Sequence, residues 1–185
     1  NRALAGLVLD ELGRRGHAGP DGRPLAAALL PPSGSPAVRL PARAELLRLG
    51  EVPLVLDGAH TPGSVADLLA DLAQPPAGAA GRPLAILGMN ADKDLGGILK
   101  GLAGRVDRVL CTSVGGVLAR SPEQIAEAAR ALGMEAETAD TPRMALERAR
   151  ELVPPGGWVV VLGSLHLAGA IRPLIATSTT RPAAC

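Results

Sequence analysis

Strand-like and helix-like segments alternate along most of this 185-residue chain, and this alternation restricts the possible fold more than any other feature. Short apolar runs typical of buried strands are followed by segments that carry apolar residues at helical spacing. The expected strands are 52–56, 84–87, 108–111, 135–138 and 158–162, and the expected helices are 62–73, 95–103, 122–132 and 142–152. Such alternation predicts right-handed strand–helix–strand units. The predicted fold class is therefore α/β, with a Rossmann-like, mostly parallel sheet flanked by helices.

The first 37 residues have a different character. Residues 1–16 form an amphipathic helical pattern that Asn1 caps and that Gly13 and Gly16 stop. Residues 17–37 are rich in proline and glycine around one short apolar helix, 25–30, and predict a linker. Because the chain begins without Met inside a helical pattern, we expect an amino-terminal part to be missing. The expected division is a helical remnant of another domain with its linker at 1–37, an α/β domain at 38–175 and a disordered tail at 176–185.

A hairpin is expected where the α/β domain begins. Residues 38–40 and 44–49 are short β-capable pieces around Pro41, and Gly50 and Glu51 form a turn before the strand 52–56. Two such runs joined by a two-residue turn predict an antiparallel pair at the start of the sheet.

The composition argues against several classes of function. Phe and Tyr are absent and Trp158 is the sole aromatic residue, so base-stacking nucleic-acid binding is not expected, and the net charge of +1 gives no polyanion footprint. Cys111 and Cys185 form neither a zinc spacing nor a disulfide framework, which favours a reducing, cytoplasmic setting. No apolar run approaches the roughly 18 residues that a membrane helix needs. We expect a soluble monomer without nucleic-acid, membrane or metal sites of its own.

Polar side chains follow several of the predicted strands. Asp57 and His60 come directly after the strand 52–56, and the loops 89–94, 112–121 and 163–166 are polar too. Because the carboxyl ends of parallel strands share one edge, these loops are expected to form a ligand crevice beside helix starts. The further candidates in them are Asn90, Asp92, Lys93, Asp94, Ser113, Arg120, Ser121, Ser164 and His166.

Each of these residues also has a purely structural interpretation. Asp57, Asp94 or Ser121 would cap a helix, Lys93 would be solvated, and His166 would pack with one hydrogen bond. Neither GxGxxG nor a P-loop of the form GxxxxGKS or GxxxxGKT occurs in the chain, so no motif of its own supplies a phosphate cradle.

Four pieces of this sequence, in the same order, resemble the carboxy-terminal part of folylpolyglutamate synthase and dihydrofolate synthase, in the Mur ligase superfamily. They are residues 40–43 (LPAR, for LPGR), 56–62 (LDGAHTP, for LDGAHNP), 92–94 (DKD) and 163–167 (GSLHL). Residues 1–5 (NRALA) are similar to a helix that closes the family's central ATPase domain. The resemblance covers nearly the whole chain, and it departs from the family at Ala42, where Gly is usual, and at Thr61, where Asn is usual.

The resemblance implies an ATP- and Mg²⁺-dependent ligase that adds L-glutamate to dihydropteroate or a folate through an acyl phosphate. The site residues it implies are Arg43 and His60 in catalysis, Asn1, Arg43, Asp57 and His60 around ATP, and Lys93, Ser164 and His166 at the substrate. The family's P-loop and metal ligands belong to an amino-terminal ATPase domain, the implied partner of this chain. We therefore expect no turnover by this chain alone.

Two alternatives stay open beside this interpretation. One is another amide ligase of the superfamily, acting on UDP-MurNAc peptides, and the other is a non-catalytic module that binds a nucleotide or a protein. The DGAH and GSLH pieces together favour the folate branch. They do not separate the first glutamate addition from polyglutamate extension.

Overall fold

The computed structural model describes residues 2–30 and 40–178, and the chain divides into two compact units, Asn1–Val38 and Arg39–Cys185. The first unit contains one α-helix, α1 (Arg2–Arg14), and one 3-10 turn, η1 (Ala27–Leu29). The expected helix at 25–30 is thus only a single turn. Its first N–H, at Ala27, donates to Asp10 Oδ1 at 2.6 Å, which ties it to α1.

Gly13 does not stop the first helix as predicted. It lies inside α1, where a Cβ would come within 1.8 Å of the Leu25 carbonyl oxygen, so its lack of a side chain lets the returning segment pack against the helix. The chain leaves the helix at Gly16, whose φ of 86° suits glycine. The apolar Leu7 and Val8 of α1 are both exposed.

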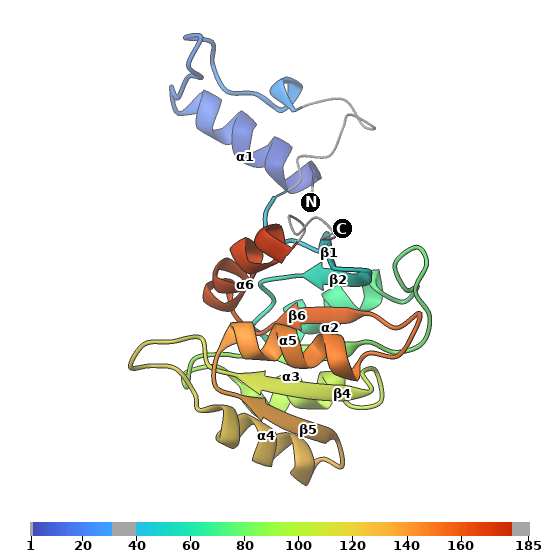
Figure 1. Cartoon of the computed structure of the whole chain (residues 1–185). Helices are drawn as coiled ribbons and strands as arrows, with labels where there is room; N and C mark the ends of the chain where they lie inside the picture. The colour runs from blue at the N-terminus through green and yellow to red at the C-terminus, as the bar shows by residue number, and fades with distance from the viewer. Residues whose placement is uncertain (1, 31–39, 179–185) are drawn as a thin grey trace. The chain divides into compact units, whose positions relative to one another are not determined.

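The second unit is built on a six-stranded sheet in the order β1-β2-β6-β3-β4-β5 (Figure 1). The strands are β1 (Glu45–Leu49), β2 (Val52–Leu56), β3 (Leu84–Leu87), β4 (Arg108–Thr112), β5 (Glu135–Ala139) and β6 (Val159–Leu162). Only β1 is antiparallel to its neighbour, with Glu45 opposite Leu56 and Leu49 opposite Val52. The β2–β6, β6–β3, β3–β4 and β4–β5 pairs are all parallel, which confirms the predicted fold class.

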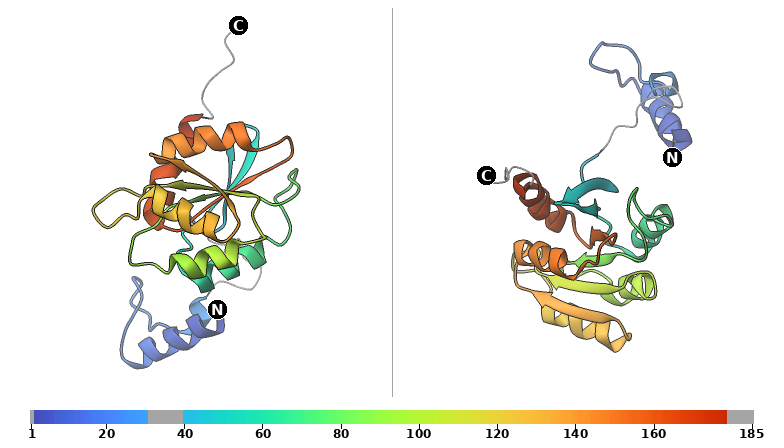
Figure 2. Two further views of the ribbon diagram at one scale, coloured as in Figure 1. Left: turned by 90° about the horizontal axis from the view of Figure 1, so that it is seen from below. Right: turned by 45° about the vertical axis from the view of Figure 1, so that its right-hand side comes forward.

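Five helices cover the two faces of this sheet. They are α2 (Pro62–Asp71), α3 (Leu95–Leu102), α4 (Pro122–Ala131), α5 (Pro142–Leu152) and α6 (Leu165–Ser178). Figure 2 shows α5 and α6 on one side of the sheet and α2 and α3 on the other. The buried residues of α4 pack in the same cluster as those of α2 and α3. No helix in residues 2–30 or 40–178 is long and apolar enough to cross a membrane.

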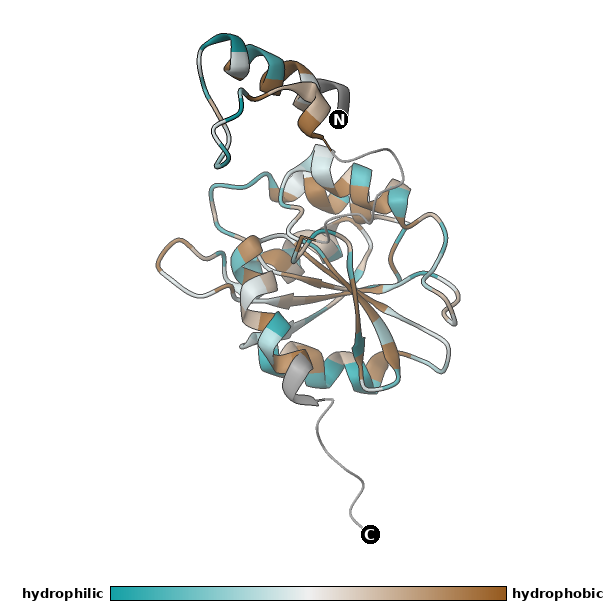
Figure 3. Ribbon diagram, turned by 90° about the horizontal axis from the view of Figure 1, so that it is seen from above, coloured by the Kyte–Doolittle hydropathy of each residue, from teal (hydrophilic) through white to brown (hydrophobic). Residues whose placement is uncertain are grey.

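The inner strands β2, β3, β4 and β6 are buried on both faces along most of their length because each face meets a helix layer, whereas the edge strands β1 and β5 contain exposed residues. Along β2, Val55 packs toward α2 and α3, whereas Leu54 and Leu56 pack toward α5 and α6. Figure 3 shows the strands as a hydrophobic centre between the helices. Burial on both faces is what the apolar central strands of the sequence predicted.

Helix starts are set by local sequence signals. Thr61 and Ser121 each form a capping box with the residue three positions later, and proline follows each cap. Asp94 caps α3 by accepting the Gly97 N–H at 2.8 Å. The structural interpretation was therefore right for Asp94 and Ser121.

The largest difference from the predicted elements is α6. Residues 165–175 had no assigned structure and 176–178 were placed in a disordered tail, yet all belong to this helix. Leu167, Ala168 and Ile171 bury its inner face against the sheet. Residues 179–185 of the expected tail and Val38–Arg39 of the expected first strand lie outside the described residues, and Leu40 is not in a strand.

Candidate functional site

A pocket of about 180 Å³ opens where β2, β3 and β6 end. The residues around it come from the loops that follow these three strands: His60, Asn90, Lys93, Gly163, Ser164, Leu165 and His166. The pocket therefore brings together four of the predicted site residues, His60, Lys93, Ser164 and His166. Arg43 and Asp57 do not line it, and Asn1 lies outside the described residues.

Three helices begin at the loops that line this pocket. His60 precedes α2, Lys93 precedes α3, and Ser164 precedes α6. The first turn of a helix carries the positive end of its dipole, although the caps Thr61, Asp94 and Ser164 already accept some of the N–H groups there. The three dipole ends and Lys93, which Asp92 balances in part, favour an anionic ligand such as a phosphate or a carboxylate at this edge of the sheet.

His60 is held in a defined orientation. Its Nδ1 lies 2.7 Å from the Gly58 carbonyl oxygen, which can only accept, so Nδ1–H is the donor. In the neutral ring Nε2 is then left without a proton. The backbone N–H of His60 donates to Ser64 Oγ at 3.2 Å, so the loop that carries the ring is fixed to the first turn of α2. His60 thus offers an oriented hydrogen-bond acceptor at the pocket.

Asp57 is engaged by backbone groups on both of its oxygens. The side chain is only 7% exposed. Oδ1 accepts the Ala59 N–H at 2.6 Å and Oδ2 accepts the Ala44 N–H at 2.7 Å. The Gly58 N–H also donates to the Ala42 carbonyl at 3.0 Å. Asp57 therefore fastens the loop at 42–44 to the end of β2.

The loop held in this way presents Arg43. Ala42 and Ala44 on either side of it have φ values of 55° and 44°, a left-handed conformation that is unusual for alanine and that glycine would adopt without strain. The Ala42 N–H donates to Glu45 Oε2 at 3.0 Å. The Arg43 side chain is exposed and has no hydrogen bond or ion pair with any described residue. Its guanidinium is free to meet an anion.

Gly163 and Ser164 shape the opposite wall of the pocket. Gly163 has a φ of 105°, and its N–H donates to the Ala59 carbonyl at 2.6 Å. The buried Ser164 accepts the His166 N–H on Oγ at 3.0 Å and the Ala168 N–H on its carbonyl at 3.1 Å. Ser164 therefore caps α6, and its hydroxyl is already used in part by the protein.

Lys93 belongs to an ion pair at the rim. Its Nζ lies 2.9 Å from Asp92 Oδ2, and this hydrogen bond lowers the pKa of the Asp92 carboxyl. The same loop is supported by the loop that precedes α4, because the Arg120 guanidinium donates to the Ala91 carbonyl at 2.7 Å. Within residues 2–30 and 40–178, no group of three or more His, Cys, Asp or Glu side chains is placed to hold a metal ion.

Asn90 was among the residues that the sequence placed in the expected crevice, and it does line the pocket, whereas Gly163 and Leu165 were not selected as site residues. For Gly163, the signal was a glycine directly after an apolar strand, where a close approach of two backbones is common.

The family model for the Mur ligase, glutamate ligase domain, matches residues 42–165. Among solved structures, the folylpolyglutamate synthase of Mycobacterium tuberculosis complexed with ADP and AMPPCP is 31% identical over 79% of this chain and 34% of its own, with a TM-score of 0.66. The bifunctional folylpolyglutamate synthase/dihydrofolate synthase of Yersinia pestis is 28% identical over 94% of this chain and 37% of its own, with a TM-score of 0.70.

The same Yersinia pestis enzyme complexed with AMPPNP and a Mn ion is 29% identical over 76% of this chain and 32% of its own, with a TM-score of 0.66. This chain thus spans about a third of the length of these solved relatives. A search of curated proteins found no similar sequence.

Proposed function

We propose that this chain is the carboxy-terminal part of an ATP-dependent folate ligase. The chain belongs to the Mur ligase family, because the model of that family's glutamate ligase domain matches residues 42–165. The enzyme would add L-glutamate to dihydropteroate or to a folate. One observation carries this proposal: an oriented His60, Lys93 and three helix starts meet at one pocket at the carboxyl edge of the sheet. Phosphate and carboxylate groups are the ligands that such an edge favours.

The reaction would transfer the ATP γ-phosphoryl group to the substrate carboxylate with release of ADP. The amino group of glutamate would then attack the acyl carbon, lose a proton and displace inorganic phosphate, which leaves the amide. Little covalent work falls to the protein in such a reaction, so positioning and charge stabilisation dominate. The Arg43 guanidinium would grip two phosphate oxygens at once, as its planar fork allows. His60 would accept a hydrogen bond from the nucleoside through Nε2. Lys93 and His166 would face the carboxylates of the incoming glutamate.

The divalent metal would be held elsewhere. Bound Mg²⁺ would neutralise charge on the phosphate oxygens, but the described part of this chain offers no set of ligands for it. Its ligands and the P-loop would come from an ATPase domain on the same polypeptide, and the unit that contains α1 would be the helical end of that domain. Asn1 would then lie near the adenine.

The substrate assignment is tested with a protein that joins this chain to its ATPase domain. We expect ADP release that requires both glutamate and either dihydropteroate or tetrahydrofolate. The 185-residue chain alone should give none, because one wall of a two-domain site cannot hold the metal. Release driven by a UDP-MurNAc peptide instead would support the peptidoglycan branch, and turnover by the isolated chain would show that the active site has been misplaced.

We further propose that Asp57 positions the Arg43 loop and does not hold the nucleoside as a direct ligand. Both of its oxygens already accept backbone N–H groups, at 2.6 Å and 2.7 Å. In Asp57→Asn an amide NH₂ would face one of these N–H groups, and a buried donor would lose its acceptor. We expect the free energy of unfolding to fall by roughly 1–3 kcal/mol, measured by chemical denaturation.

Asp92→Asn is the matched control, since that carboxylate lies at the exposed rim and its loss should change stability by less than about 0.5 kcal/mol. An Asp57→Asn protein as stable as the unmodified chain would mean that the two backbone bonds contribute little, and would return Asp57 to the role of a ligand.

A further inference from the structure

A second pocket, of about 210 Å³, lies at the opposite edge of the sheet. Trp158 immediately precedes β6, Pro83 immediately precedes β3, and Arg105 comes shortly before β4, so its residues gather at the amino ends of the strands. The candidate active site uses the carboxyl ends of the same strands. The two pockets share no residue.

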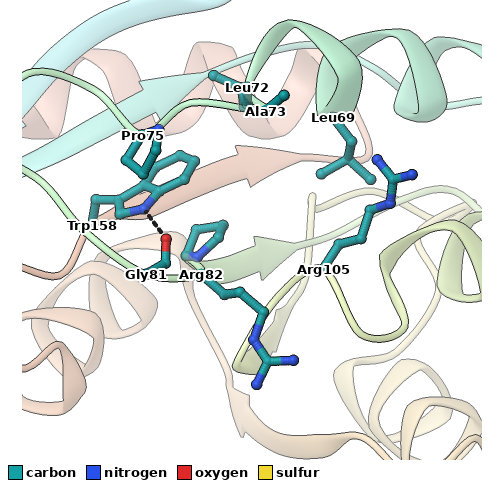
Figure 4. A pocket seen from close by; sticks show the side chains of 9 residues that line it. Leu69, Leu72, Ala73, Pro75, Gly81, Arg82, Arg105 and Trp158 are labelled. Atoms are coloured by element: carbon teal, nitrogen blue, oxygen red, sulfur yellow. Dashed lines mark hydrogen bonds between the residues drawn. The ribbon is translucent and has the colours of Figure 1, made fainter.

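We call this cavity the Trp158 pocket. One of its walls is apolar and is held in place by hydrogen bonds. Pro75 lies beside the indole of Trp158 with Leu72 near it, and Leu69 lies farther along the pocket, toward Arg105 (Figure 4). The indole Nε1–H donates to the Gly81 carbonyl at 3.0 Å, and Trp158 is only 3% exposed. The Ala80 N–H donates to the Gly156 carbonyl at 2.8 Å, which joins the loop over the pocket to the turn before β6. The walls are thus preformed, which lowers the entropic cost of binding.

The pocket carries one positive charge that the protein does not balance. Arg82 is occupied, because its Nε donates to Asp107 Oδ1 at 2.9 Å and its Nη1 to the Gly104 carbonyl at 3.2 Å. In Figure 4 its guanidinium points away from Trp158. Arg105 has no ion pair or side-chain hydrogen bond with any described residue, and its guanidinium lies beside Leu69.

We propose that the Trp158 pocket binds a small organic carboxylate that carries an apolar ring. The ring would lie mainly against Pro75 and Leu72 and touch the small exposed part of Trp158, and the carboxylate would pair with Arg105. The volume is below the roughly 300–1,000 Å³ of sites for drug-sized ligands, so a single ring of about ten heavy atoms fits it. A ligand of that size is expected to bind with a dissociation constant on the order of 1 mM.

The chain itself supplies the probe for this proposal. Trp158 is the only aromatic residue, so intrinsic tryptophan fluorescence reports on this pocket alone. Titration of the 185-residue chain with cyclohexanecarboxylate should give a saturable change in emission. Cyclohexanecarboxamide, which has the same ring without the charge, should bind about tenfold more weakly or worse, because the charge-assisted hydrogen bond is lost. Acetate, which lacks the ring, should give no saturation in the same range.

Two variants locate the carboxylate. Arg105→Gln should weaken cyclohexanecarboxylate binding about tenfold, whereas Arg143→Gln, an exposed arginine on α5, should leave it unchanged. Thermal melting confirms that both variants are folded. Saturation-transfer NMR on the ligand protons measures binding even where the emission does not change.

Several results would overturn the proposal. They are the absence of binding by both methods at about 10 mM, equal affinity for the acid and the amide, and an unchanged affinity in Arg105→Gln. Displacement of the carboxylate by ADP would show that it occupies the nucleotide edge and not a separate site. Failure of the folate ligase assignment would leave all of these outcomes unaffected, because no residue of the Trp158 pocket belongs to the candidate active site.

Discussion

Arg43→Ala is expected to slow glutamate-dependent turnover about a hundred- to thousandfold in a protein that joins this chain to its ATPase domain. The side chain is exposed, without a partner among the described residues, on a loop that Asp57 and Glu45 hold in place. A guanidinium presented in this way would be used most strongly as the phosphoryl group transfers. Loss of one preorganised donor raises a barrier by roughly 2.7–4 kcal/mol, which gives this range of rates.

The conservative change and a neighbouring arginine make the test specific. Arg43→Lys should recover only part of the rate, because a point charge cannot reproduce a bidentate grip. Arg48→Ala removes an exposed arginine from the same hairpin and should leave turnover near normal. Steady-state kinetics and thermal melting would be measured on all three. A well-folded Arg43→Ala protein with normal kcat/KM would eliminate the catalytic role.

Gly163→Ala should lower the free energy of unfolding by roughly 2–4 kcal/mol. The φ of 105° is a conformation that alanine rarely adopts, and a Cβ there would come within 2.6 Å of the Gly88 carbonyl oxygen and 2.8 Å of Leu87 Cδ1. Backbone strain and overpacking each contribute on the order of 1–3 kcal/mol. The backbone of β3 cannot move aside easily, because it is paired on both sides by β4 and β6. Denaturation curves of the 185-residue chain would measure the loss.

Gly169→Ala is the matched control for this substitution. Gly169 lies inside α6 and a Cβ there meets no atom within 4 Å, so alanine should raise stability by about 0.5–1 kcal/mol. Opposite signs for the two variants are therefore expected. If Gly163→Ala were as stable as the unmodified chain, the strand ends around the pocket would have to be far more adaptable than their contacts indicate.

The sequence predicted the sheet well because strands and helix starts can be recognised from short segments of sequence. Apolar runs marked the strands, and caps such as Asp94 and Ser121 marked where helices begin, so the parallel sheet and its hairpin are confirmed. The cap of α2 is Thr61, whereas the sequence offered Asp57. The helix α6 was missed because Gly169 and Pro173 interrupt its pattern, and both residues usually argue against a helix interior. Only packing of Leu167 and Ile171 on the sheet reveals that the helix continues.

The sequence predicted part of the candidate site, and it did not predict the hydrogen bonds that hold the surrounding loops. His60, Lys93, Ser164 and His166 were expected together because strand ends share an edge, and they do line one pocket. The bond from the Ala44 N–H to Asp57 joins residues 13 positions apart across the β1–β2 hairpin, in which Glu45 lies opposite Leu56. The predicted hairpin brings the two residues together, but only the tertiary structure shows that the side chain of Asp57 accepts this N–H.

The β1–β2 hairpin restricts how many residues can separate the Arg43 loop from the DGAH segment in homologous chains. Glu45 lies opposite Leu56, so the loop before β1 and the loop after β2 meet at the same end of one ladder, closed at the other end by Gly50 and Glu51. A residue inserted in one strand alone would turn every later side chain to the wrong face. As long as the turn is kept, homologous chains should therefore vary the interval between the arginine loop and the DGAH segment by multiples of four residues, with two residues gained or lost in each strand.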